Sequence, residues 1–212
     1  MTDLYFGVSD DFDVKEFQNR KVMDEIKMVM TAFDCVLSDD SGIYCSSDIT
    51  TGKRFYFEVF NRYEVRSDEE LKAKLGEPAY GNVIKDFIDE SVKRGKEFTE
   101  KLRERGEINL LNPGPFYGPN FAQQHYHYLW EWVIIKKIYQ VYFNEDWQYS
   151  NGCTLEFAIA VKKGIPRFDH MGNALDLLQG IAMIERALAE LKGRSIFVKK
   201  LEQNLALIKR LQ

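Results

Sequence analysis

Residues 138–169 read IYQVYFNEDWQYSNGCTLEFAIAVKKGIPRFD and contain a complete alternation of secondary structure. The apolar run Ile138 to Asn144 is typical of a buried strand, the polar stretch Glu145 to Gly152 predicts a loop, and Thr154 to Lys163 has helical spacing. Gly164 to Asp169 then predicts a turn and another strand. A strand, a helix and a strand in succession indicate two parallel strands with the helix packed on the sheet.

The alternation continues on both sides of this unit. Ile108 to Leu111 predicts a strand, which the turn Asn112 to Phe116 (NPGPF) ends, and Phe121 to Lys137 predicts an aromatic-rich helix. Two more helices are expected near Ala174 to Lys192 and Phe197 to Leu211. We therefore predict an α/β fold, with a flavodoxin-like or Rossmann-like parallel sheet flanked by helices.

The N-terminal half has a less regular pattern. Strands are expected at Leu4–Val8, Cys35–Leu37 and Arg54–Phe60, and helices at Val14–Phe33, Ser67–Leu75 and Tyr80–Arg105. The helix after Ser67 is indicated by a capping signal, in which Glu70 follows three residues later. We predict one domain over residues 1–212, with an insertion at about residues 34–77.

Composition excludes several classes of protein. The formal net charge is −4 and no cluster of Lys and Arg dominates, so we do not expect a nucleic acid polymer as the partner. Three cysteines without metal-ligand spacing are typical of reduced thiols. Neither a signal peptide nor a membrane span is expected, so we predict a cytoplasmic protein.

The sheet also predicts where a ligand binds. In open parallel sheets, ligands lie outside the carboxyl ends of the strands. Three stretches follow predicted strands: Asn112–Phe116, Asn144–Glu156 and Asp169–Asn173. Residues 108–170 are therefore the predicted region of the site.

The central loop carries residues that suit anion binding. A loop that contains Ser150 and Gly152 and opens a helix presents backbone N–H groups and the positive end of the helix dipole. Glu156 follows Gly152 by one helical turn, so its carboxylate can face the same side. From spacing alone, an ordinary helix cap explains these residues equally well, with Ser150 or Asn151 as the cap and Glu156 as a first-turn acid.

Residues 108–168 resemble the superfamily of nucleoside 2-deoxyribosyltransferases and deoxynucleoside 5′-monophosphate N-glycosidases, in particular a phage and bacterial branch with Trp before the Ser-x-Gly loop. The ordered features that carry the resemblance are Asn112-Pro113, Val141-Tyr142-Phe143, Asp146-Trp147, Ser150-x-Gly152-x-x-x-Glu156 and Ala160-(x)3-Gly164-Ile165-Pro166. The first hundred residues do not match the family pattern.

The resemblance implies roles for individual residues. Glu156 matches the glutamate nucleophile, and Ser150 matches the serine that holds the 5′-phosphate in the monophosphate-cleaving branch. Glu131 falls within one residue of the second carboxylate, which protonates the departing base. The alternative for Glu131 is a carboxylate at the edge of the sheet, in contact with water.

Other residues are expected to line the site. Trp147 is predicted to stack on the base or cover the pocket, and Phe116 is given a similar role. Asp146, Asn151 and Asn112 lie in the same loops. His125 and His127 lie two positions apart and do not share a helix face, so we expect no metal.

The sequence thus predicts a metal-independent hydrolase that cleaves the N-glycosidic bond of a nucleoside 5′-monophosphate without a cofactor. A 2-deoxyribosyltransferase is one alternative, and a non-catalytic protein that binds a nucleotide or nucleoside is another. We also expect a homodimer, because enzymes of this type often complete the pocket across a subunit interface.

Overall fold

The computed structural model describes residues 16–212, and its centre is a four-stranded sheet in which all paired strands are parallel. The strands are β1 (Gly42–Ser46), β2 (Leu110–Leu111), β3 (Ile138–Phe143) and β4 (Arg167–Phe168), in the spatial order β2-β1-β3-β4. Tyr44 of β1 pairs with Leu111 on one side and with Val141 on the other. The predicted α/β fold with a flavodoxin-like or Rossmann-like parallel sheet is confirmed.

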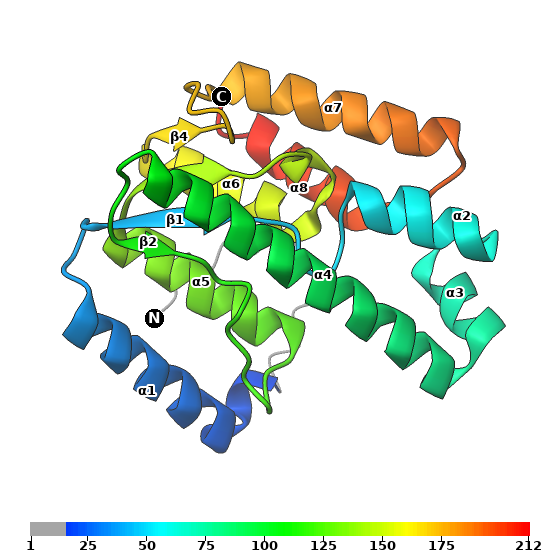
Figure 1. Cartoon of the computed structure of the whole chain (residues 1–212), viewed down its shortest axis with the longest axis horizontal. Helices are drawn as coiled ribbons and strands as arrows, with labels where there is room; N and C mark the ends of the chain where they lie inside the picture. The colour runs from blue at the N-terminus through cyan, green and yellow to red at the C-terminus, as the bar shows by residue number, and fades with distance from the viewer. Residues whose placement is uncertain (1–15) are drawn as a thin grey trace.

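Helices make up most of the described chain (Figure 1). The α-helices are α1 (Arg20–Val36), α2 (Phe60–Tyr63), α3 (Asp68–Leu75), α4 (Glu77–Glu104), α5 (Gln123–Lys137), α6 (Asn151–Lys163), α7 (Leu177–Gly193) and α8 (Lys199–Lys209). Short helical turns occur at η1 (Glu16–Gln18), η2 (Phe55–Val59, π-helical) and η3 (Trp147–Tyr149). Within residues 16–212, none of the helices combines the length and the apolar content needed to cross a membrane.

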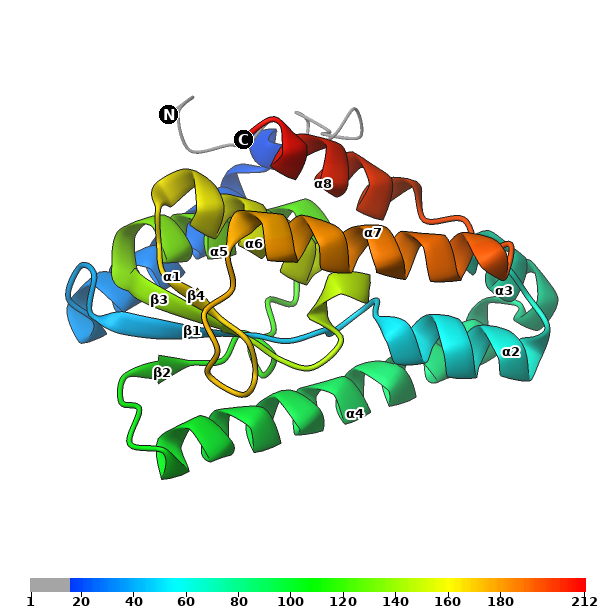
Figure 2. The same ribbon diagram turned by 90° about the horizontal axis from the view of Figure 1, so that it is seen from above.

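The helices form layers on the two faces of the sheet (Figure 2). Phe98 and Leu102 of α4 pack with Ile43 and Cys45 of β1, so α4 covers one face. Helices α5 and α6 cover the opposite face, and α7 and α8 lie outside α6. The large apolar cluster lies between these helices and the sheet.

Local signals explain the boundaries of the helix that carries Glu156. The hydroxyl of Ser150 accepts a hydrogen bond from the N–H of Cys153 and caps the start of α6. Gly164 ends the helix in the left-handed conformation, with φ of 68°. A similar cap at Ser67, which accepts from the N–H of Glu70, confirms the predicted start of α3.

Two predicted strands are wrong. The run Arg54 to Phe60, predicted as a strand from its aromatic residues, forms η2 and the start of α2. The helical path buries Phe55, Tyr56 and Phe60 against one another, which a strand would place on opposite faces. Cys35, expected in a short strand, lies in the last turn of α1.

The predicted insertion is also wrong in its extent. Residues 34–77 contain β1, which lies between β2 and β3 in the sheet, so this region supplies a central strand of the fold. The strand expected at Leu4–Val8 lies outside the described residues.

The strand order creates a switch point between β1 and β3. From β1 the chain passes through α4 to β2, whereas from β3 it passes through α6 to β4 on the other side. Because α4 and α6 cover opposite faces of the sheet, the loops after β1 and β3 diverge at their carboxyl ends. Such a divergence is where open α/β sheets bind ligands.

Candidate functional site

The carboxyl group of Glu156 lies at this switch point and is held by two hydroxyl groups of β1. Tyr44 donates a hydrogen bond to Oε1 over 2.7 Å, and Ser46 donates to Oε2 over 2.5 Å. Glu156 itself is on the first turns of α6, so two segments about 110 residues apart in sequence meet here. Both carboxylate oxygens are therefore fixed in orientation.

The surroundings act on the protonation of Glu156 in opposite directions. Burial raises the pKa of the carboxyl group, while the hydrogen bonds from Ser46 and Tyr44 lower it, and the net pKa is raised. Burial and the charge of Glu156 raise the pKa of Tyr44 far above its ordinary value. The phenol of Tyr44 therefore stays protonated and acts as a donor.

The first turn of α6 is held by side chains around it. The N–H of Asn151 donates to the hydroxyl of Thr51 over 3.1 Å, and Asn204 of α8 donates to the carbonyl of Asn151 over 2.8 Å. Within the described chain, no residue accepts a hydrogen bond from the N–H of Gly152. A Cβ atom at Gly152 would come no closer to the rest of the protein than 3.8 Å, to Ser150 Oγ. One N–H without an acceptor in the described chain thus lies at the positive end of α6.

The loop after β1 brings a cation to the same end of the sheet. Lys53 Nζ lies 3.1 Å from Asp146 Oδ1 and 5.4 Å from the centre of the Tyr149 ring. Asp146 has a left-handed backbone, with φ of 62°, and precedes η3. The predicted residue Asp146 is therefore an ion-pair partner that positions Lys53.

Aromatic residues of α5 and of the NPGPF turn lie next to the Tyr44 ring. Trp130 packs against Tyr44 with ring centroids 6.2 Å apart, and Phe116 packs edge-on against Trp130 at 5.4 Å. Phe116 is half-buried, so part of its ring is accessible. Among the predicted aromatic contacts, Phe116 is thus connected to the Glu156 region through Trp130 and Tyr44.

Asn112 follows β2 and lies next to Gly95 of α4. Its Oδ1 accepts a hydrogen bond from the N–H of Gly114 over 2.9 Å and so shapes the NPGPF turn. A Cβ atom at Gly95 of α4 would lie 3.5 Å from both the Asn112 amide and Ser47 Cβ. Because Gly95 has no side chain, α4 can approach β1 and β2 closely. The Asn112 side chain packs against α4 at this contact.

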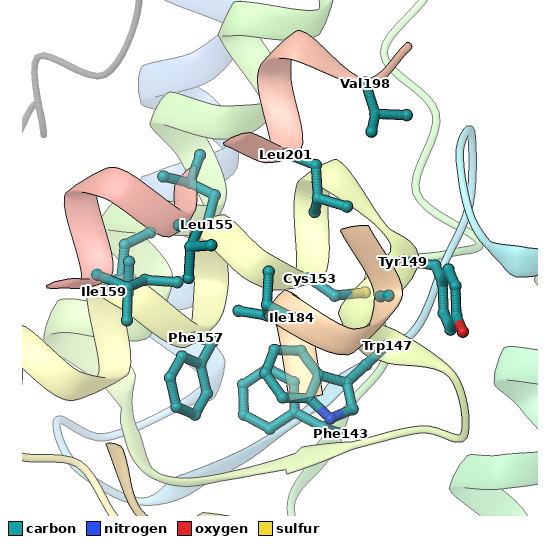
Figure 3. Close-up of a cluster of buried hydrophobic side chains, with 14 of the residues drawn as sticks. Phe143, Trp147, Tyr149, Cys153, Leu155, Phe157, Ile159, Ile184, Val198 and Leu201 are labelled. Carbon is teal, nitrogen blue, oxygen red and sulfur yellow. The ribbon is translucent and has the colours of Figure 1, made fainter. Parts of the chain in front are cut away.

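Trp147 does not have the predicted role in stacking on a base. The residue is 2% exposed. Its ring stacks on Phe157 with centroids 4.9 Å apart and packs on Phe143 with centroids 4.8 Å apart. Figure 3 shows its indole beside these rings, with Ile184 of α7 close by. Trp147 is a core residue that anchors the loop after β3, because a large apolar ring is more stable away from water.

Glu131 is buried on α5, with 4% exposure, and not at a hydrated edge. It follows Trp130, and successive residues of an α-helix point about 100° apart. Its charge adds to burial in raising the pKa of Tyr128, which packs edge-on against Phe17 of η1. These contacts place Glu131 near the η1 side of α5, and its predicted role as an acid stays a prediction.

Sequence reasoning missed several residues of the site. Tyr44 and Ser46 lie in β1, which was not predicted, and Asp48, Thr51 and Lys53 follow in the loop after it. Asp48 is buried beside Arg94 of α4, whose Nη1 lies 4.0 Å from Asp48 Oδ2. The short strand GIYCS gives little periodic signal, so only the tertiary pairing identifies these residues.

Among residues 16–212, no group of three or more His, Cys, Asp and Glu side chains is arranged to hold a metal ion. His125 is fully buried, and its Nδ1 accepts a hydrogen bond from the N–H of Ala122 at the start of α5.

Neither protein-family models, nor curated proteins, nor solved structures match this chain. The relationship to the nucleoside 2-deoxyribosyltransferase and N-glycosidase superfamily stays a prediction from residues 108–168.

Proposed function

We propose that this protein is an N-glycoside hydrolase that cleaves the base–sugar bond of a nucleoside 5′-monophosphate, with Glu156 as the nucleophile. The observation that carries the proposal is the carboxylate of Glu156, oriented by Tyr44 and Ser46 at the switch point of the sheet. The resemblance of residues 108–168 to nucleoside-cleaving enzymes gives independent support.

The chemistry requires an ionised and well-oriented carboxylate. Glu156 attacks the anomeric carbon as the bond to the base breaks, and a covalent glycosyl ester forms and is then hydrolysed by water. The donors Tyr44 and Ser46 oppose the effect of burial on the pKa and so favour the ionised form. They also fix the direction of the attacking oxygen, which lowers the entropic cost of the reaction.

The start of α6 supplies a site for the 5′-phosphate. The unclaimed N–H of Gly152 lies one helical turn, about 6 Å along the axis, from Glu156. A sugar between a phosphate at Gly152 and a reacting carbon at Glu156 spans this separation. Lys53 adds a positive charge, and Ser150, whose hydroxyl caps the helix, fixes the backbone of this turn.

The test is release of free base from a panel of ribo- and deoxynucleoside 5′-monophosphates, measured by chromatography. We expect release by the wild-type protein and loss of at least roughly 10³-fold in Glu156→Gln, which keeps the shape of the side chain but removes the nucleophile. Glu145→Gln, at an exposed position in the adjacent loop, is the matched control and should retain activity.

Other outcomes would identify the alternatives. Base exchange on unphosphorylated nucleosides in the presence of an added base indicates a 2-deoxyribosyltransferase. Saturable binding of a nucleotide without any product, equal in wild type and Glu156→Gln, indicates a non-catalytic binding protein. Either result would reject the hydrolase.

A further inference from the structure

Asp48 is a second buried carboxylate, in the loop that follows the strand of Ser46, the donor to Glu156. Ser46, which donates to Glu156, is the last residue of β1, and Asp48 follows it by two positions, about 6.6 Å in an extended chain. The thiol of Cys153 lies near both carboxylates: its pKa is raised by burial, by the charge of Glu156 and, to a smaller extent, by that of Asp48.

The protein holds Asp48 in place despite its burial. Arg94 of α4 provides an opposite charge, with Nη1 at 4.0 Å from Oδ2. Gly52 is packed so tightly against the group that a Cβ atom there would lie 2.5 Å from Oδ2. Only 5% of Asp48 is exposed. A carboxylate that needs a partner arginine and a glycine beside it is unlike the solvated acids elsewhere on the chain.

We propose that Asp48, positioned by Arg94, is the proton donor to the departing base; this inference rests on the proposed hydrolase function. In the first step Glu156 forms a bond to the anomeric carbon, the electrons of the C–N bond pass to the base, and Asp48 transfers its proton to the base. In the second step Asp48 accepts a proton from water as the water oxygen replaces Glu156 on the sugar. Both carboxyl groups are thereby restored.

The protonation of Asp48 suits this role. Burial raises its pKa, and the charge of Asp146 adds to this effect, while Arg94 and Arg54 lower it, and the net pKa is raised. The charged groups that act on Asp48 are thus Arg94 of α4, Arg54 and Asp146, and Asp146 is itself paired with Lys53 at 3.1 Å. Glu131, by contrast, acts on Tyr128 near η1.

The decisive experiment compares two substrates that differ only in whether the base needs a proton to leave. A guanine nucleotide requires protonation, whereas a 7-methylguanine nucleotide already carries the positive charge. If the enzyme prefers pyrimidines, uracil and 5-fluorouracil nucleotides form a weaker pair, because the fluorinated base leaves as a less basic anion and depends less on protonation. We expect Asp48→Asn to lower kcat/KM by roughly 10²-fold or more on the first substrate and by less than about tenfold on the second. Asp89→Asn, an exposed change on α4, is the control.

The outcomes separate the two proposals. If Asp48→Asn lowers kcat/KM equally on both substrates, Asp48 is not the proton donor, and the proposal of a hydrolase stands. If Glu131→Gln, and not Asp48→Asn, lowers kcat/KM on the first substrate alone, the proton donor is Glu131. A wild-type protein that releases base from no nucleotide of the panel overturns the hydrolase and the role of Asp48 together.

A second variant tests the contribution of Arg94 without changing Asp48. Removing the positive charge in Arg94→Gln raises the pKa of Asp48, since Arg94 lowers it. The acid then stays protonated to higher pH, so the basic limb of the kcat/KM profile moves to higher pH on the guanine substrate only. An unmoved limb would contradict the proposal.

Discussion

At the scale of single residues, Glu156 combines two properties that act against each other. Burial of its carboxyl group at the switch point disfavours the ionised form, and the donors Tyr44 and Ser46 only partly restore that form. A Glu whose pKa in the folded protein exceeds its ordinary value of 4.5 stabilises the fold only while it is protonated. Its contribution is complete below pH 4.5 and is lost as the pH rises through the folded-state pKa.

Glu156→Gln should therefore stabilise the protein relative to wild type as the pH rises. The amide cannot ionise and still accepts the hydrogen bond from Tyr44, so the variant avoids the cost of a buried charge. We expect the difference in Tm between Glu156→Gln and wild type to be small near pH 4 and to grow towards pH 7. Glu145→Gln should show no such growth, and a difference that is independent of pH would refute the burial of a charged Glu156.

The residue scale also marks a limit of sequence reasoning. Glu156, Ser150 and Gly152 could be selected because they lie within one loop and the first turns of one helix. Tyr44, which lies 112 residues from Glu156 in sequence, has no local feature that connects it to the site. Trp147 was assigned to the ligand because its loop is polar, whereas apolar neighbours from β3 and α6 bury it.

At the scale of elements, the position of α6 depends on its contact with α7. Gly180 of α7 lies against the ring of Phe157, and a Cβ atom there would lie 2.2 Å from Phe157 Cζ. The ring cannot move away easily, because it stacks on Trp147 and packs on Phe143.

Gly180→Ala is expected to destabilise the protein, although alanine favours helices. The gain in helix propensity is about 1 kcal/mol, and overpacking against Phe157 costs about 1–3 kcal/mol, so we expect a net loss of up to roughly 2 kcal/mol. The same change at Gly193 meets nothing within 4 Å and should stabilise by up to about 0.5 kcal/mol. Urea unfolding measures both, and equal effects at the two positions would contradict the described packing.

Elements with a strong period could be predicted from the sequence, and those without one could not. The sequence predicts the ends of the long helices α4 and α5 and of the apolar strand β3 to within a few residues. The run from Phe55 to Phe60 has apolar residues at nearly every position, so it fits the period of a helix and that of a strand. Tertiary packing determines that the run is helical. Strand β1 was missed because its five residues mix small, polar and aromatic side chains.

At the scale of the whole molecule, the site joins parts of the chain that lie far apart in sequence. The loop after β1 contacts α6 through Thr51, and α8 contacts the same turn through Asn204, so a ligand at Gly152 rests on residues from the N-terminal and the C-terminal parts of the chain. A ligand that binds only this assembled arrangement must stabilise the entire fold.

A nucleoside 5′-monophosphate should therefore raise the free energy of unfolding, by about 2.7 kcal/mol at a hundred times its Kd. Glu156→Gln is the suitable protein for this measurement, because it retains the phosphate site and does not consume the ligand. In the same background, Gly152→Ala adds a methyl group in open space beside the unclaimed N–H, so the fold tolerates it while the phosphate is displaced. Stabilisation by the monophosphate should then require a higher concentration, and stabilisation by the unphosphorylated nucleoside should be unchanged. If Gly152→Ala weakened both ligands equally, or neither, the phosphate would not lie at the start of α6.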